Sequence, residues 1–283
     1  MSKLVDSLLV ALTDNAPWVA LTGAGISHAS GIPTYRDHSG RWLGSQPIQH
    51  QDFIDQPAAR RRYWSRSVFG WPRVAAALPN ATHHALAQME SAGVLTGIIT
   101  QNVDRLHQKA GSHNVVDLHG RLDQVKCLDC GAMETRQNIQ QMLVASNTLP
   151  TPETLTLRPD GDADLPSDVI EDFAVPECKH CGGVVMPDVV FFGGSVPQSR
   201  AQECYDLIDA SRGMLVIGSS LSVYSGFRFC RYLVGQDKPL LILNQGDTRA
   251  DDICTQKYDT EPFSLLTECA ALLAQKLAEV AHD

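Results

Sequence analysis

Short apolar runs alternate with longer amphipathic stretches along most of this chain. The apolar runs predict buried strands at 18–22, 94–100, 115–118, 188–192, 214–217 and 240–243. The amphipathic stretches predict helices over about 2–14, 51–70, 83–92, 197–211 and 262–280, with two more after residues 104 and 220. Strands that alternate with helices are typical of an α/β protein built on a parallel sheet.

Polar or glycine-rich residues follow one predicted strand after another. These segments are GAGIS from residue 23, QNVD from 101, HG at 119–120, FFGG from 191, GSS from 218 and NQG from 244. Open parallel sheets bind their ligands outside the carboxyl ends of the strands. We therefore expect these segments to converge at one edge of the sheet.

The segment after the first strand has the features of a phosphate-binding turn. Residues 18–22 lead into Gly23-Ala24-Gly25, where glycines let the backbone approach a pyrophosphate and a helix N-terminus supplies free N–H groups. The third glycine of the dinucleotide-binding pattern is absent, because His28 takes its place. A tight turn without a ligand therefore stays an alternative. Residues 30–37 predict an ordered loop in which Arg36 is placed to meet a phosphate.

Half of the eight cysteines form two Cys-x-x-Cys pairs, each followed by glycine. Their spacing is that of a tetrahedral zinc site with four thiolates, whereas a redox dithiol would need only one pair. Four protein ligands leave no open coordination position, so we predict one structural zinc ion. The expected ligands are Cys127, Cys130, Cys178 and Cys181. The expected buried thiols are Cys204, Cys230, Cys254 and Cys269.

Composition narrows the classes of function. The 283 residues are 43% hydrophobic and 19% charged, which is ordinary for a globular enzyme with one sizeable core. The net charge of −9 argues against a nucleic-acid partner but not against a basic protein or peptide substrate. No run reaches the roughly 18 apolar residues of a membrane span, and we see no secretory or transit-peptide pattern. We therefore expect a cytoplasmic protein with no membrane partner, and the oligomeric state stays open.

Taken together, and in this order, the motifs resemble those of the sirtuin family. The similar segments are GAGIS and SGIP, TQNVD from residue 100, HG at 119–120, the two cysteine pairs, and GSS from 218. The resemblance spans about residues 17–265. Segments such as PIQHQDF, RYWSR, FGWP and CLDCG look most like the class II branch, which includes a mitochondrial sirtuin of the sirtuin-four type.

The resemblance implies a fold and a reaction. The fold would be an α/β, Rossmann-like parallel-sheet domain with a small zinc-ribbon domain inserted. Residues 1–120 and 188–283 would bind NAD, and 121–187, with the helical part near 40–80, would form the zinc-binding domain. The protein would be an NAD-dependent lysine deacylase, with NAD and an acylated protein or peptide meeting in the cleft between the domains.

The resemblance also implies roles for single residues. Val190 would accept the acyl-lysine N–H through its backbone carbonyl, and Phe192 would line the substrate tunnel. The residues implied to contact NAD are Gly23, Ala24, Gly25, Tyr35, Arg36, Gln101, Asn102, Asp104, Gly218, Ser219, Ser220, Asn244 and Gly246. Thr34 and Gly194 stand where the family often has acidic residues, so peptide contacts and loop behaviour are expected to differ.

His119 is the expected general base. The reaction needs a group that deprotonates a ribose hydroxyl near neutral pH, and an imidazole at a strand end beside a glycine suits this task. A single histidine is more often a satisfied core residue. Its position among the other strand-end motifs favours the catalytic interpretation.

Three other functions share some of these features. A mono-ADP-ribosyltransferase or NAD glycohydrolase begins with the same departure of nicotinamide, so the sequence does not separate it from a deacylase. A non-catalytic NAD-sensing or interaction module would be expected to lack His119 or Asn102, and both are present. A Rossmann dehydrogenase is disfavoured by the missing third glycine and by the absence of an acidic residue after a second strand.

The sequence does not decide whether the preferred acyl group is acetyl, acidic, lipoyl or a longer chain. Tyr63 and Arg66 are three residues apart on a predicted helix and therefore share a face. Their spacing resembles the pair with which class III sirtuins hold the carboxylate of succinyl- or glutaryl-lysine, and a guanidinium can bind a carboxylate with two hydrogen bonds. The alternative is a solvated helix face that includes Arg60, Arg61 and Arg62.

Overall fold

The computed structural model describes residues 3–34, 47–150, 170–260 and 262–280. Its larger sheet has six parallel strands in the order β3-β2-β1-β7-β8-β9. The strands are β1 (Trp18–Thr22), β2 (Leu95–Thr100), β3 (Val115–Asp117), β7 (Gly213–Ile217), β8 (Leu240–Leu243) and β9 (Gln256–Tyr258). The predicted Rossmann-like parallel sheet is confirmed.

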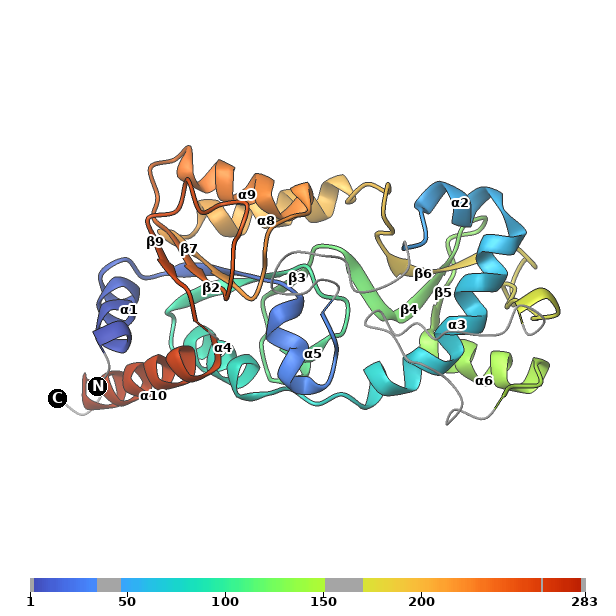
Figure 1. Ribbon diagram of the computed structural model, residues 1–283, viewed down its shortest axis with the longest axis horizontal. Helices are drawn as coiled ribbons and strands as arrows, with labels where there is room; N and C mark the ends of the chain where they lie inside the picture. The colour runs from blue at the N-terminus through green and yellow to red at the C-terminus, as the bar shows by residue number, and fades with distance from the viewer. Residues whose placement is uncertain (1–2, 35–46, 151–169, 261, 281–283) are drawn as a thin grey trace.

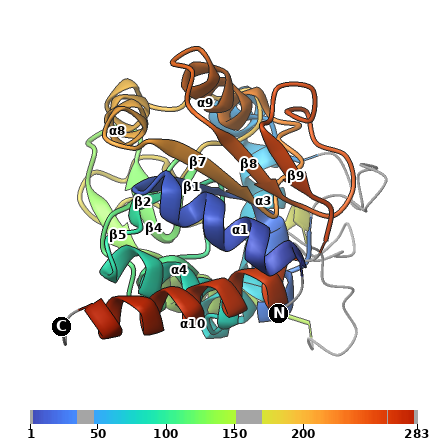
Figure 2. The ribbon, with the colours of Figure 1, turned by 90° about the vertical axis from the view of Figure 1, so that its left-hand side faces the viewer.

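Helices cover both faces of this sheet (Figure 1 and Figure 2). One face carries α1 (Lys3–Asp14), α4 (Ala81–Ser91) and α10 (Pro262–Val280). The other carries α8 (Gln198–Asp209) and α9 (Tyr224–Val234). Because both faces are covered, every residue of β1, β7 and β8 is buried. These strands therefore form continuous apolar runs in the sequence rather than an alternating pattern.

A second, antiparallel sheet has the strand order β5-β4-β6. Its strands are β4 (Gly120–Cys127), β5 (Met133–Thr135) and β6 (Val185–Val189). Three helices lie beside it, α2 (His50–Asp55), α3 (Pro57–Ala76) and α6 (Arg136–Ser146). Phe53, Trp64, Val125 and Ile139 belong to the core that joins these helices to the sheet. Figure 1 shows the two sheets at opposite ends of the molecule.

The prediction that 188–192 is a strand of the parallel sheet is wrong. The strand found there is β6, which begins at Val185 and pairs antiparallel with β4. It lies at the edge of the small sheet, and an edge strand tolerates Pro187. Beyond β6 the backbone N–H of Val190 donates to the carbonyl of His119 at 2.8 Å. The segment after β6 therefore still meets His119, although it does not end a strand of the larger sheet.

Several helix predictions also differ from the structure. The helix expected over 51–70 is divided into α2 and α3, and α3 continues to Ala76. The helix after residue 104 is the single turn α5 (Leu106–Lys109), and a 3₁₀ helix, η1 (Ala24–Ser30), follows β1. The sequence analysis missed α6, β4, β5 and β9. None of the described helices combines the length and the apolar character that a membrane span needs.

Two buried histidines join α4 and α5 to the larger sheet. Nε2 of His107 lies 2.9 Å from Oγ1 of Thr22, whose hydroxyl donates to Oγ1 of Thr100. The ring of His83 lies 4.9 Å from that of His107, centroid to centroid, and its Nδ1 accepts from the N–H of Asn80. Burial lowers the pKa of His83 to about 4 and the pKa of His107 well below its usual value. Both rings are therefore neutral at pH 7.

We expect the free energy of unfolding to fall as the pH drops from about 6.5 to about 4. In this window the unfolded chain binds protons at these histidines and the folded chain does not, so acid favours the unfolded state. The loss from His83 alone amounts to about 3 kcal/mol at the lower end. Urea unfolding across this pH range measures it.

His83→Gln should be less stable than the natural chain at pH 7 but lose less stability in acid. The exposed His28 supplies the control, because His28→Gln should leave the acid-induced loss unchanged. An equal loss in the natural chain and in His83→Gln would contradict this account.

Candidate functional site

Two glycine-containing turns meet where the strand order of the larger sheet reverses. The chain continues from β1 to β2 on one side, whereas β7 lies on the other side of β1. The N–H of Gly23 donates to the carbonyl oxygen of Ile217 at 3.1 Å, and the N–H of Gly25 donates to the carbonyl oxygen of Gly218 at 2.9 Å. A Cβ on Gly23 would lie 2.7 Å from the Cβ of Ser219. This close packing places both turns at the position where open α/β sheets bind ligands.

The QNVD segment after β2 holds the turn after β1. Nδ2 of Asn102 donates to the carbonyl of Gly23 and to Oγ of Ser27, both at 3.0 Å. The Ser27 hydroxyl donates to Oδ2 of Asp104 at 2.7 Å, and Oδ1 of Asp104 accepts from the N–H of Leu106. Burial raises the pKa of Asp104, and these hydrogen bonds oppose that rise. The sequence analysis did not single out the buried Ser27, although it lies within the GAGIS motif.

Gln101 joins the end of β2 to the turn after β7. Its Nε2 donates to Oγ of Ser219 at 2.8 Å and to the carbonyl of Thr22 at 3.3 Å. The Ser219 hydroxyl oxygen also accepts from the N–H of Leu221 at 3.2 Å. The predicted residues at the ends of β1, β2 and β7 therefore form one hydrogen-bonded group.

His119 lies beside this group with both ring nitrogens engaged. Its Nδ1 is 3.0 Å from the carbonyl oxygen of Gln101, and its Nε2 is 2.7 Å from Oγ of Ser225 on α9. A carbonyl can only accept, so Nδ1 donates and Nε2 is the basic nitrogen of the neutral ring. Burial lowers the pKa of His119, and Arg200 and Arg228 lower it further. Ser225 was not predicted from the sequence.

The remaining predicted cofactor residues lie at neighbouring strand ends. Asn244 follows β8, and its Nδ2 donates to the carbonyls of Gln245 and Gly246. Oγ of Ser220 is 2.9 Å from Oγ of Ser222. These side chains bond within their own turns, so they form a second part of the same edge. Ala24 is half-buried at the start of η1. Tyr35 and Arg36 lie outside the described residues.

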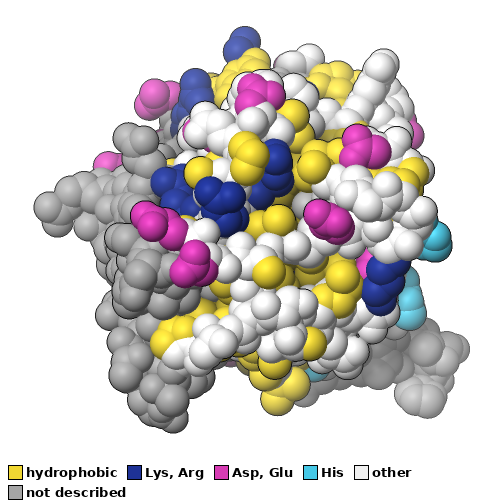
Figure 3. Space-filling model, turned by 90° about the vertical axis from the view of Figure 1, so that its right-hand side faces the viewer, with side chains coloured by type: hydrophobic (Ala, Val, Ile, Leu, Met, Phe, Trp, Pro, Cys, Tyr) yellow, Lys and Arg dark blue, Asp and Glu magenta, His cyan; other side chains and the backbone are white. Residues whose placement is uncertain are grey.

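The predicted substrate residues lie on α3 and on the segment that follows β6. The Tyr63 ring is 5.3 Å from the ring of Phe191 and 5.6 Å from that of Phe53. Phe192 is 36% exposed, and its carbonyl accepts from the N–H at the start of α2. Arg66 is half-buried one turn after Tyr63. Figure 3 views the end of the molecule that carries α3, where basic side chains gather beside hydrophobic ones.

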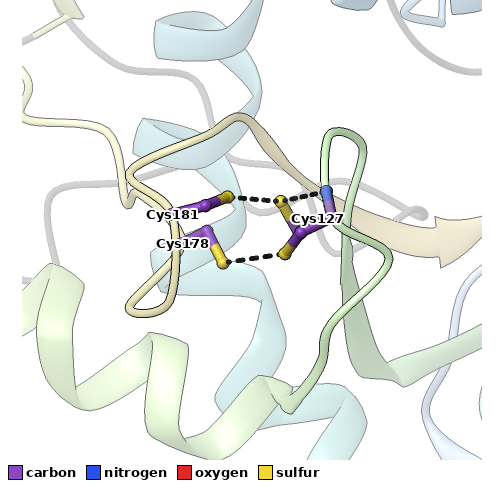
Figure 4. A group of neighbouring side chains, drawn as sticks. Cys127, Cys178 and Cys181 are labelled. Carbon is purple, nitrogen blue, oxygen red and sulfur yellow. Dashed lines mark hydrogen bonds between the residues drawn. The ribbon is translucent and has the colours of Figure 1, made fainter.

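The paired cysteines come together at the far end of the small sheet. Figure 4 shows the sulfurs of Cys127, Cys178 and Cys181 directed toward one another. The Sγ atoms of Cys127 and Cys181 are 3.6 Å apart, those of Cys130 and Cys178 are 3.7 Å apart, and all four lie within 4.8 Å. Tetrahedral zinc with Zn–S bonds of about 2.3 Å requires sulfurs about 3.8 Å apart. The four cysteines are therefore positioned to bind one structural zinc ion.

Comparison with curated proteins finds relatives over most of the chain. Residues 23–225 match the Sir2 family. An NAD-dependent protein deacetylase of Xanthomonas axonopodis pv. citri (strain 306) is 49% identical over 239 residues, which cover 84% of this chain and 82% of that protein. NAD-dependent protein deacetylase 1 of Streptomyces coelicolor (strain ATCC BAA-471 / A3(2) / M145) is 45% identical over 263 residues, which cover 93% and 88%.

Solved structures agree with this result. One described as "Sir2-p53 peptide-NAD+" is 31% identical, with a TM-score of 0.75 over 99% of this chain and 100% of that chain. Another, "Sir2 bound to acetylated peptide", is 29% identical, with a TM-score of 0.73 over 98% of each chain. The sequence match, the fold and the cysteine cluster agree, and the chain belongs to the Sir2, or sirtuin, family.

Proposed function

We propose that this protein is an NAD-dependent protein lysine deacylase, which transfers the acyl group of an acyl-lysine to ADP-ribose and releases nicotinamide. The observation that carries the proposal is the half-buried His119, held in one tautomer by the Gln101 carbonyl at the carboxyl edge of the sheet. The relatives named NAD-dependent protein deacetylase support it, as does the similar structure with an acetylated peptide.

The residues at the strand ends fit NAD. Gly23 and Gly25 have no side chains in the turn after β1, so a pyrophosphate can approach the backbone there, and the Asp104 carboxylate is directed to Ser27 and to the N–H of Leu106. We infer that Gln101, Asn102 and Asp104 serve the nicotinamide-ribose end. The residues inferred to hold the remainder are Gly23, Ala24, Gly25, Tyr35, Arg36, Gly218, Ser219, Ser220, Asn244 and Gly246.

His119 accepts the proton in this mechanism. When bound, NAD supplies the ADP-ribose to which the acyl group is transferred. The lowered pKa of His119 keeps the ring neutral at pH 7, so Nε2 offers its lone pair to a ribose hydroxyl. The ring becomes positive when Nε2 takes the proton, and the Gln101 carbonyl stabilises that charge through Nδ1–H. Asn102 fixes the adjoining turn through Gly23 and does not exchange a proton.

We also infer the division into domains that the sequence predicts, with 1–120 and 188–283 binding NAD and 121–187 binding zinc. The three-stranded sheet and α6 support it, because most of their residues fall within 121–187. The shared core of α3 with that sheet supports placing the helical part near 40–80 in the small domain. The class II assignment and a cytoplasmic location stay predictions.

For the acyl group, we infer that Tyr63 and Arg66 lie at the distal end of the substrate tunnel. The supporting contact is that of the Tyr63 ring with Phe191, which lies between Val190 and Phe192. A half-buried guanidinium one turn further along α3 would meet the end of an acyl chain that carries a carboxylate.

We expect Cys130→Ala to lose zinc and to unfold at lower temperature than the natural chain. Removing one of four thiolates from a closed site forfeits much of the binding free energy, which is on the order of 10 kcal/mol for zinc in small peptides. Elemental analysis and thermal unfolding measure the two effects. Cys254→Ala is the control, since Cys254 lies outside the cluster and should keep the metal. Zinc-free natural protein with full activity would refute the assignment.

We expect His119→Ala to reduce turnover about 100-fold or more, the usual contribution of a general base, while NAD binding is retained. The natural enzyme should lose kcat/KM in acid through a pKa below the ordinary histidine value of about 6.5, because burial lowers the pKa of His119. The exposed His113 supplies the control, as His113→Ala should keep full activity. Near-normal turnover of His119→Ala would exclude it as the base.

A panel of acyl-peptides can be incubated with NAD and analysed by mass spectrometry. The products distinguish a deacylase from the two alternative activities. A deacylase yields free lysine, nicotinamide and O-acyl-ADP-ribose. ADP-ribose attached to the peptide would instead indicate a mono-ADP-ribosyltransferase. Nicotinamide release with an unchanged peptide would indicate an NAD glycohydrolase.

We expect Arg66→Met to remove a preference for acyl chains that end in a carboxylate and to spare neutral acyl groups. Loss of a buried partner of a carboxylate costs a few kcal/mol, roughly 100-fold in kcat/KM. Arg62→Met changes an exposed arginine of the same helix and is the matched control. Equal loss on acidic and neutral substrates would assign Arg66 to structure.

A further inference from the structure

The hydroxyl of Ser225 lies against the basic nitrogen of His119. Oγ of Ser225 is 2.7 Å from Nε2, and Nδ1 on the other side of the ring is 3.0 Å from the Gln101 carbonyl oxygen. The carbonyl keeps a hydrogen on Nδ1 in both protonation states of the ring. Nε2 is therefore the atom that gains and loses a proton, and its partner in the described structure is Ser225.

A hydroxyl can pair with both states of the imidazole. When the ring is neutral, the Ser225 O–H donates to the lone pair of Nε2. When the ring is positive, Oγ accepts from Nε2–H. The second hydrogen bond is the stronger one, because its donor is charged. Ser225 therefore stabilises protonated His119 more than neutral His119.

The charged groups around His119 act in the opposite direction. Burial, Arg200 on α8 and Arg228 on α9 all lower the pKa of this ring. Among the described residues, the buried Nε and Nη2 of Arg228 have no hydrogen-bond partner, so no carboxylate accepts from these two atoms there. Asp188 lies 3.9 Å from Arg200 and offsets part of that charge. The positive end of the α9 dipole adds to the same effect. The two hydrogen bonds of the ring are what favour its charged form.

The local structure directs this serine to His119 rather than to helix capping. Ser225 is the second residue of α9, whose N-cap Val223 makes no side-chain capping bond. Serine near a helix start commonly bonds a backbone N–H, but this hydroxyl is directed across to His119. Gly226 follows, and a Cβ there would lie 2.7 Å from Oε1 of Gln101. The glycine therefore lets α9 approach the segment that holds the other side of the ring.

We propose that Ser225 is a positioning residue for the general base. It holds the His119 ring between two hydrogen bonds and accepts from Nε2–H once the ring has taken the proton. The inference rests on the proposed deacylase function. The ribose hydroxyl first replaces the Ser225 O–H at the lone pair of Nε2. One proton then leaves the ribose hydroxyl and bonds to that lone pair, and the electron pair of the broken O–H bond stays on the ribose oxygen. Oγ of Ser225 accepts from Nε2–H when the ribose oxygen moves away. Ser225 neither gains nor loses a proton overall.

The first test needs no cofactor. Nitrogen NMR of the ring in the natural protein should show neutral His119 with hydrogen on Nδ1. In Ser225→Ala the pKa of His119 should fall further, by about half a unit to one unit, because the positive ring loses its charged hydrogen bond. Ser225→Thr keeps the hydroxyl and should restore the natural value. Ser199→Ala, an exposed serine replaced on α8, should leave the titration unchanged.

The second test is kinetic. Ser225→Ala should lower kcat about five- to tenfold with little change in the KM for NAD or peptide, and the acid limb of its pH profile should move to lower pH. Ser225→Thr should recover most of the rate. A rate loss with an unmoved pH profile, or without recovery in Ser225→Thr, would mean that Ser225 serves only the fold.

The two tests separate the possible failures. Natural protein that does not deacylate would overturn the proposed function, while the NMR titration still decides whether Ser225 controls the ring. Hydrogen found on Nε2 of the neutral ring in the natural protein would overturn the inference even if Ser225→Ala did not fold. An unchanged His119 pKa in folded Ser225→Ala would overturn it as well.

Discussion

The contact between two turns at the edge of the larger sheet is the constraint on which the candidate site depends. The N–H of Gly25 donates to the carbonyl of Gly218 at 2.9 Å, and a Cβ on Gly25 would lie 2.8 Å from that oxygen. The two backbones approach this closely because neither residue has a side chain. The ends of β1 and β7 are thereby held together, and Gln101 can reach Ser219 across them. A polar group is assembled at the point where the strand order reverses.

The larger sheet could be predicted from the sequence because its central strands are buried on both faces. Strands β1, β7 and β8 are buried on both faces, so each is a continuous apolar run, and parallel strands end at a common edge. The antiparallel sheet lacks this signal. The buried residues of β4 do not alternate with exposed ones, and β5 has only three residues, so neither shows a clear period. Pattern alone therefore assigned the apolar run at 188–192, which overlaps only the end of β6, to the larger sheet.

Within the candidate site, the sequence identifies residues with distinctive chemistry but not the residues that form hydrogen bonds with them. His119 and the paired cysteines are recognisable because few residue types offer a base near pH 7 or four thiolates at zinc spacing. Ser225 is a common residue type, 106 positions from His119, and only the packing of α9 brings the two together. The same holds for Ser27, which meets Asp104 across 77 positions. Contacts of this kind depend on tertiary structure and leave no local pattern.

The cysteine cluster and His119, the proposed general base, lie at opposite ends of strand β4. Strand β4 begins at Gly120, directly after His119, and ends at Cys127, so the chain between His119 and Cys127 spans at most about 26 Å. At the near end, a Cβ on Gly120 would lie 2.0 Å from the carbonyl oxygen of Asp188, which shows how closely β6 approaches β4 there. At the far end, Cys178 and Cys181 lie just before β6 and join it to β4 through the cluster. A zinc ion bound there would therefore take no part in the chemistry proposed for His119. It would join β6 to β4 at the end of the strand pair that is opposite to His119.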